Sequence, residues 1–234
     1  MAVPNADRPG APTCFAETIA ALTERAAALA ASGSRRLLGI TGPPGAGKST
    51  VCAAMIEALG ERAALIGMDA FHLSNEQLIR LGRRDRKGAP DTFDVDGYVA
   101  LLRRARAEAD RTVYAPRFDR GIEESICAAV AIEPQVSLVI TECNYLLMPD
   151  GGWQDVRPAL DEVWCLEVSE QLTRQRVVAR RQSFGTPPAQ ARAVTEQVDV
   201  RNAGLVAAHR ERADLIVTVP DDPAAVAGHP KEPQ

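Results

Sequence analysis

Gly-Pro-Pro-Gly-Ala-Gly-Lys-Ser-Thr, residues 42–50, matches the phosphate-binding pattern G-x-x-x-x-G-K-[ST] in full. It lies between a short apolar run at 36–40 and a helix-like segment at 48–59. In such a loop, glycines let backbone N–H groups face a polyphosphate, Lys48 adds a cation, and Ser49 adds a hydroxyl for Mg²⁺. The N-terminus of the following helix favours the same anion. The stretch therefore predicts a nucleoside triphosphate site, and the alternative is a chance match in a turn rich in glycine and proline. The residues expected to contact the nucleotide are Gly42, Pro43, Pro44, Gly45, Ala46, Gly47, Lys48, Ser49 and Thr50.

The composition is that of a single α/β domain. The chain has 234 residues, of which 46% are hydrophobic, and this is enough for one sizeable core. A formal net charge of −4 offers no general basic field for nucleic acid or for an anionic membrane. We expect one domain over residues 15–220, between a flexible N-terminal segment at 1–14 and a flexible tail at 221–234.

Cysteine usage and the N-terminal residues indicate a cytoplasmic protein. The five cysteines are scattered and include no Cys-x-x-Cys pair, which argues against a disulfide framework and against a zinc site. Residues 1–12 lack a basic region followed by an apolar core, and no apolar run reaches membrane-spanning length. We therefore expect reduced thiols, no membrane partner and no nucleic-acid partner.

Apolar runs alternate with helix-like segments along the chain. The expected strands cover residues 36–40, 63–68, 136–141, 163–168 and 215–219, and the expected helices cover residues 15–31, 48–59, 76–81, 95–109, 170–184 and 189–213. This alternation predicts an α/β fold with a mainly parallel sheet flanked by helices. Residues 113–114 and 128–132 break the alternation, and we expect them to form a small antiparallel flap at the acceptor site.

Polar residues that directly follow apolar runs are further candidates, because parallel α/β sheets bind ligands at the carboxyl ends of their strands. Asp69 follows Ala-Leu-Ile-Gly-Met, and Glu142 follows Leu-Val-Ile-Thr. Phosphoryl transfer needs a metal clamp, positive charge and a group that orients the acceptor hydroxyl. Asp69 suits the last role, and Glu142 together with Ser49 suits Mg²⁺. The alternative for each carboxylate is a polar strand end or a helix cap.

Four blocks in this order resemble the superfamily of uridine kinase, phosphoribulokinase and bacterial pantothenate kinase. They are residues 42–50, Met-Asp-Ala-Phe-His-Leu at 68–73, Arg-Lys-Gly-Ala-Pro-Asp-Thr-Phe-Asp at 86–94 and Thr-Glu-Cys-Asn-Tyr-Leu at 141–146. The resemblance covers residues 37–219 and extends to the nucleoside/nucleotide kinase-like branch. It implies a three-layer P-loop NTPase-type fold, the use of ATP and Mg²⁺, Asp69 as catalytic base and Glu142 as the Walker B carboxylate. It also suggests a homodimer.

The predicted helix at 170–184 is rich in arginine. Two of its arginines, Arg176 and Arg180, share a face at i, i+4, and a Gly-Thr-Pro-Pro stretch follows as a hinge. The segment resembles the family's lid, whose arginines neutralise transition-state charge. Arg176 and Arg180 are therefore catalytic candidates beside Asp69 and Lys48, and the alternative is a solvated basic face.

The acceptor site has three candidates, His72, Arg117 and Asp119. His72 lies just beyond Asp69, and the other two belong to a polar stretch after a short apolar run. Arg117 suits a carboxylate or a phosphate, and Asp119 suits sugar hydroxyls, although each also suits a structural turn. The basic stretch at 83–87 either attracts an anionic substrate or forms a solvated loop.

Two residues depart from the family pattern, because Ala70 and Cys143 stand where glycine is usual. Glycine permits a positive φ or a close backbone approach, so a side chain there could displace Asp69 or Glu142. Cys143 is either a small buried apolar residue or an active-site thiol.

These observations predict an ATP- and Mg²⁺-dependent kinase that transfers the γ-phosphate to an alcohol of a small metabolite, of nucleoside, pantothenate or sugar type. One alternative is an ATP-binding accessory or switch protein with little transferase activity, and another is a nucleoside monophosphate kinase. The guanine-specificity motif Asn-Lys-x-Asp is missing from the sequence, which counts against a GTPase switch.

Overall fold

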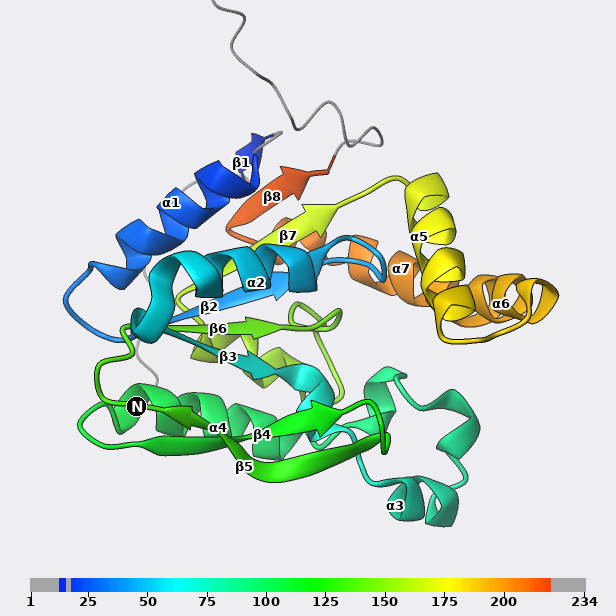
Figure 1. Ribbon diagram of the computed structural model, residues 1–234, viewed down its shortest axis with the longest axis horizontal. Helices are drawn as coiled ribbons and strands as arrows, with labels where there is room; N and C mark the ends of the chain where they lie inside the picture. Colours follow the sequence, from blue (N-terminus) through cyan, green and yellow to red (C-terminus); the bar gives the residue numbers. More distant parts are fainter. Residues whose placement is uncertain (1–12, 16–17, 220–234) are drawn as a thin grey trace, which may run out of the picture.

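The computed structural model describes residues 13–15 and 18–219, which form a parallel sheet covered by helices (Figure 1). The sheet has six strands in the order β1-β8-β7-β2-β6-β3, and every neighbouring pair is parallel. These strands are β1 (Thr13–Phe15), β2 (Arg36–Thr41), β3 (Ala63–Gly67), β6 (Leu138–Glu142), β7 (Glu162–Glu167) and β8 (Leu215–Thr218). Because all six run the same way, their carboxyl ends meet at one edge of the sheet.

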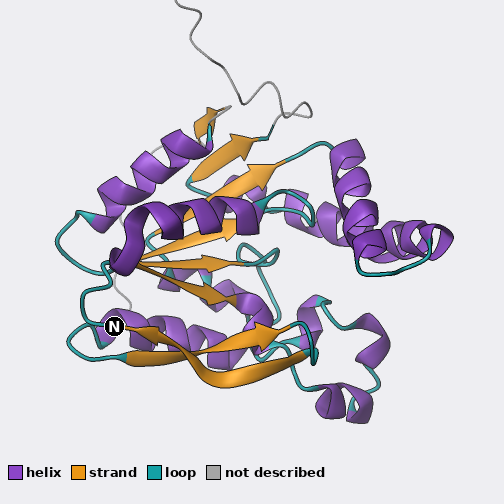
Figure 2. Ribbon diagram, viewed as in Figure 1, coloured by secondary structure: helices purple, strands orange, loops and turns teal. Residues whose placement is uncertain are grey.

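Helices cover both faces of the sheet and its carboxyl edge (Figure 2). They are α1 (Ile19–Ala30), α2 (Lys48–Leu59), α3 (Asn75–Arg80), α4 (Val95–Ala107), α5 (Glu170–Ser183), α6 (Pro188–Val194) and α7 (Val200–Ala207). Leu38 and Ile40 pack in the core beneath α1 and α2, whereas Leu37 packs in the core beneath α4. The alternation makes three layers, as the sequence predicted. Within the described ranges, no helix is both long enough and apolar enough to cross a membrane.

The predicted elements are mostly confirmed, but β1 was not predicted and two of the predicted helices differ. The helix expected over 15–31 begins only at Ile19, because Phe15 lies in β1, which pairs with β8. Thr18 then caps α1 by accepting a hydrogen bond from the Ala21 N–H. The helix expected over 189–213 is divided into α6, a π-helical turn at Thr195–Asp199 and α7. Of the predicted terminal segments, only Thr13 and Cys14 are described, and both belong to β1.

The expected flap is an antiparallel hairpin of β4 (Val113–Asp119) and β5 (Glu124–Ile132), longer than the sequence predicted. Its base is buried against the α4 side of the sheet through Val113, Ala115 and Ile132. Its tip is tied to α3, because the Asn75 N–H donates to Glu124 Oε1 at 2.9 Å. The hairpin therefore crosses from the core to the carboxyl edge of the sheet.

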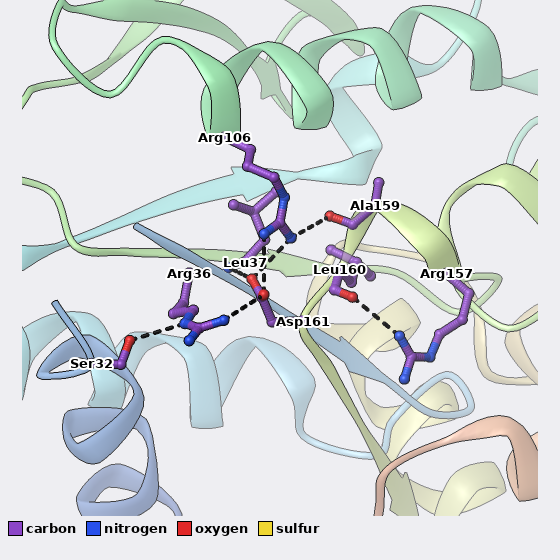
Figure 3. A network of polar contacts seen from close by, with 8 residues as sticks. All are labelled: Ser32, Arg36, Leu37, Arg106, Arg157, Ala159, Leu160 and Asp161. Atoms are coloured by element: carbon purple, nitrogen blue, oxygen red, sulfur yellow. Dashed lines mark hydrogen bonds and ion pairs between the residues drawn. The ribbon is translucent and has the colours of Figure 1, made fainter. Parts of the chain in front are cut away.

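At the opposite edge, Asp161 joins three elements (Figure 3). Its carboxylate accepts hydrogen bonds from the Leu37 N–H at 2.7 Å, from Arg106 at 2.9 Å and from Arg36 at 3.0 Å. Burial alone would raise the pKa of Asp161, but the hydrogen bonds from Arg106, Leu37 and Arg36 outweigh it and lower the pKa. This cluster holds β2, α4 and the start of β7 together at the end of the sheet opposite its carboxyl edge.

Candidate active site

The phosphate-binding loop joins β2 to α2 in a conformation that needs glycine. Gly42 has φ +146°, and a Cβ on it would lie 2.5 Å from the Leu166 carbonyl oxygen. Lys48 Nζ donates to the Gly42 and Pro43 carbonyls, each at 2.9 Å, so its ammonium lies over the loop. Burial lowers the pKa of Lys48, and the nearby Glu142 carboxylate opposes this shift. The Lys48 ammonium, the phosphate-binding loop and the N-terminus of α2 thus lie together just beyond the end of β2.

Ser49 and Glu142 lie together beside this loop. Ser49 Oγ is 3.0 Å from Glu142 Oε2 and 3.1 Å from Oε1, which brings the start of α2 to the end of β6. Burial raises the pKa of Glu142, while the Ser49 hydrogen bond and Lys48 lower it. Hydroxyl and carboxylate oxygens are ligands that Mg²⁺ prefers. No group of three or more His, Cys, Asp or Glu able to hold a metal occurs among the described residues.

Asp69 lies in the first turn after β3, a 3₁₀ helix over Met68–Phe71. Its carboxylate faces the hairpin tip, where Arg120 Nη2 lies 3.1 Å from Asp69 Oδ2. Just beyond it, His72 Nδ1 lies 2.7 Å from the Asp69 carbonyl oxygen, and the His72 ring stacks on Phe93 with 4.0 Å between centroids. Burial lowers the pKa of His72. The Asp69 carbonyl and the Phe93 ring therefore hold the His72 ring beside Asp69.

Arginines of α5 also reach the phosphate-binding loop. Arg176 Nη1 donates to the Gly45 carbonyl at 3.1 Å, and Arg180 lies one turn further along the helix. Arg181 pairs instead with the buried carboxylate of Asp199 at 2.7 Å, which holds the π-helical turn against α5. The lid arginines thus face the phosphate-binding loop.

One cavity of about 870 Å³ collects these groups. Its lining includes residues 44–50 of the loop together with Asp69, His72, Glu142, Arg176 and Arg180. Gly42 and Pro43 are not part of this lining, but their carbonyls bind Lys48. The structure therefore brings together most of the residues that the sequence singled out, at the carboxyl edge of the sheet where the strand-end rule placed them.

Arg117 and Asp119 are not in the cavity lining, so the structure does not bring them together with the other candidate residues. Arg117 is exposed on β4. Asp119 Oδ1 accepts from the N–H groups of Gly121 at 2.8 Å and Ile122 at 3.3 Å, so it stabilises the hairpin turn. The cavity instead contains the next residue, Arg120.

Other lining residues were not singled out individually as site residues by the sequence analysis, namely Lys87, Phe93, Asn144, Tyr145, Arg181 and Asp199. Lys87 belongs to the basic stretch at 83–87, for which the sequence allows either attraction of an anionic substrate or a solvated loop. Arg83 and Arg86 of that stretch pair with Asp91, so only Lys87 turns inward.

Ala70 and Cys143 cause no left-handed strain. Glu123 and Ala128 are the only non-glycine residues with positive φ in the described part of the chain. Cys143 is buried, and its Sγ accepts the Tyr145 N–H at 3.2 Å. Burial raises the pKa of this thiol well above its usual range, so it stays protonated and behaves as a small core residue.

Cys143→Gly is expected to lower the free energy of unfolding by about 1–2 kcal/mol, because it removes a buried side chain and adds backbone freedom. ATP turnover should stay within about two-fold of wild type, since no strain is relieved. Urea unfolding and an ATP turnover assay check the two parts. A clearly faster variant would show that Cys143 does compromise the site.

Comparison with known proteins agrees with this geometry. Residues 15–75 match the family model of the methylmalonyl-CoA mutase-associated GTPase MeaB. A Schizosaccharomyces pombe protein, provisionally named a uridine kinase, is 33% identical over 207 residues, which cover 84% of this chain and 88% of that protein. A pantothenate kinase of Leifsonia xyli subsp. xyli is 29% identical over 121 residues, which cover 50% of this chain and 37% of that enzyme. A solved structure from Silicibacter sp. TM1040, provisionally described as a fructose transport system kinase, superposes with a TM-score of 0.76 at 34% identity and covers 87% of this chain and 100% of that one.

The fold and the cavity define a P-loop kinase. The chain belongs to the superfamily of P-loop kinases that includes uridine kinase and bacterial pantothenate kinase, as the four sequence blocks predicted. The GTPase model ends at residue 75, so it spans the nucleotide-binding elements β2, α2 and β3 but neither the hairpin nor the lid.

Proposed function

We propose that this protein uses ATP and Mg²⁺ to phosphorylate an alcohol group of a small metabolite, of nucleoside, pantothenate or sugar type. The observation that supports it is the convergence of a phosphate-binding loop, a carboxylate at each of two strand ends and two lid arginines on one cavity. A mere nucleotide binder has no need of Asp69 beyond the β3 end or of a hairpin that walls off space beside it. The cavity volume also lies within the range of small-molecule sites.

The nucleotide end of the site is formed by the loop amides, Lys48, Ser49 and Glu142. Lys48 would bind the β- and γ-phosphates, where its ammonium replaces part of their hydration. Ser49 and Glu142 would hold Mg²⁺, which when bound neutralises phosphate charge. Arg176 and Arg180 would add positive charge at the transferred group from the lid.

The transfer forms a bond between the acceptor oxygen and the γ-phosphorus and breaks the bond to the bridging oxygen, whose electron pair leaves with ADP. The acceptor hydroxyl loses one proton, which Asp69 would accept and return to solvent. A carboxylate suits this task because it orients the hydroxyl even while the transition state is loose.

ATP consumption with Mg²⁺ should be measured across pantothenate, uridine, cytidine, fructose, ribose, ribulose 5-phosphate and nucleoside monophosphates, with mass spectrometry of the product. The proposal expects one acceptor class to stimulate consumption strongly and to gain a phosphoryl group. Stimulation only by nucleoside monophosphates would identify a nucleoside monophosphate kinase instead.

The second candidate is an accessory protein that binds nucleotide and transfers little phosphate. The match of residues 15–75 to a GTPase model is the observation that favours it. Tight ATP or GTP binding without stimulation by any acceptor would support this second candidate against the kinase.

A further inference from the structure

The cavity is more basic than the chain that forms it. The chain carries a formal net charge of −4, yet the lining holds six basic side chains and three carboxylates. The basic residues are Lys48, Lys87, Arg120, Arg176, Arg180 and Arg181, and the acidic ones are Asp69, Glu142 and Asp199. Such a site favours anions over neutral molecules.

Four of the basic residues are accounted for at the nucleotide end and in the lid. Lys48 and Arg176 contact the phosphate-binding loop, Arg180 follows Arg176 on α5, and Arg181 is neutralised by Asp199. Lys87 and Arg120 remain, and neither comes from the loop or the lid.

These two cations belong to one structural unit at the hairpin tip. Lys87 Nζ donates to the Glu123 carbonyl at 2.6 Å and to Asn75 Oδ1 at 3.0 Å, and it lies 5.3 Å from the centre of the Phe118 ring. The tip that anchors Lys87 also carries Arg120. Both cations therefore lie at the hairpin tip, on the side of Asp69 where the acceptor is proposed to bind.

The contact between Arg120 and Asp69 occupies one oxygen of the proposed base. The two side chains are 65% and 52% exposed, and exposed ion pairs of this kind contribute little stability and open readily. A better anion for Arg120 can therefore displace Asp69. Arginine suits this exchange because its guanidinium binds carboxylates and phosphates with two parallel hydrogen bonds.

The other walls on this side offer few free polar groups. The Tyr145 hydroxyl donates to the Gly88 carbonyl at 2.7 Å, and the His72 ring lies between the Asp69 carbonyl and the Phe93 ring. An anionic group on the acceptor thus finds its strongest partners in Arg120 and Lys87.

We propose that the acceptor alcohol carries an anionic group, a carboxylate or a phosphate, which is bound by Arg120 with Lys87 beside it. Binding of this group draws Arg120 away from Asp69. The freed Asp69 carboxylate then accepts a hydrogen bond from the hydroxyl group of the acceptor. Arg120 in this way makes proton acceptance by Asp69 depend on a charged acceptor. This inference rests on the proposed kinase function and specifies its substrate class.

The kinetic test uses acceptor pairs that differ only in charge: glycerate and glycerol, fructose 6-phosphate and fructose, ribulose 5-phosphate and ribulose. For the preferred scaffold, the charged member should have kcat/KM higher by about 10-fold or more, the usual scale for charge-assisted hydrogen bonds. Arg120→Gln should raise KM for the charged member by a similar factor, about 10-fold or more, and should remove most of the preference for the charged over the neutral member. Glycerate against the sugar phosphates separates a carboxylate site from a phosphate site.

Arg103→Gln is the matched control, because Arg103 is exposed on α4 and outside the cavity lining. It changes the net charge of the chain by the same amount as Arg120→Gln. Preference for the neutral members, or equal KM values for the two variants, would overturn the anionic-acceptor inference while leaving the kinase in place.

A binding test separates this inference from the kinase itself. With the loop saturated by a non-hydrolysable ATP analogue and Mg²⁺, inorganic phosphate should raise the Tm of the wild-type protein and of Arg103→Gln, but not of Arg120→Gln. If no acceptor is phosphorylated, an Arg120-dependent rise would still establish the anion site although the proposed kinase function fails. An equal rise in all three proteins, or none, would overturn the anion site.

Discussion

Asp69→Asn is expected to lower kcat by about 10²-fold or more while ATP binding stays nearly unchanged, which is the usual scale for loss of a general base. The amide keeps the size of the side chain and its place after β3, but it accepts no proton from the acceptor. Among the described residues, the Asp69 carboxylate pairs with Arg120 at the hairpin tip rather than with the phosphate-binding loop, so the nucleotide end should remain intact.

The measurement is steady-state turnover with the best acceptor, together with ATP affinity from calorimetry. Asp119→Asn is the matched control, because it makes the same chemical change at a carboxylate that serves the hairpin turn outside the cavity. Unchanged turnover in Asp69→Asn would remove Asp69 from the role of base.

Lys48→Ala is expected to weaken ATP binding, turnover or both, by about 10²-fold or more in kcat/KM, the scale seen when one preorganised electrostatic group is lost. The variant also leaves the Gly42 and Pro43 carbonyls without their partner, so a Tm measurement must accompany it. Lys48→Met, which keeps most of the side-chain volume, should lose a similar factor because the ammonium is missing. A fully active Lys48→Ala protein would contradict the assignment of the loop.

Helices and strands whose ends are set by neighbouring residues in the sequence were predicted well. The helix from Lys48 to Leu59 has the predicted bounds, because a glycine precedes it and Gly60 ends it. Strand β1 could not be foreseen, since its three residues are ordered only through pairing with β8, some 200 positions away in the sequence. The division of the last long helix had no signal either, because the π-helical turn is fixed by pairing of Asp199 with Arg181 across the lid.

The site was predictable where it follows from topology. Asp69 and Glu142 line the same cavity as the loop because parallel strands end at one edge. The acceptor side of the site could not be predicted, because Arg120 reaches Asp69 only after the hairpin tip docks on α3 through Glu124 and Asn75. A charged residue next to Asp119 gave no local sign of that contact.

Transfer of a labelled γ-phosphate from ATP to a small-molecule alcohol separates a kinase from a nucleotide-binding protein. The purified protein is incubated with Mg²⁺, ATP isotopically labelled in its γ-phosphate and the acceptor panel, and the products are analysed by mass spectrometry. We expect wild-type protein to place the label on one acceptor, with the yield falling sharply in Asp69→Asn. Label that stays in ATP, or that appears only as inorganic phosphate with every acceptor, would contradict the proposed kinase function.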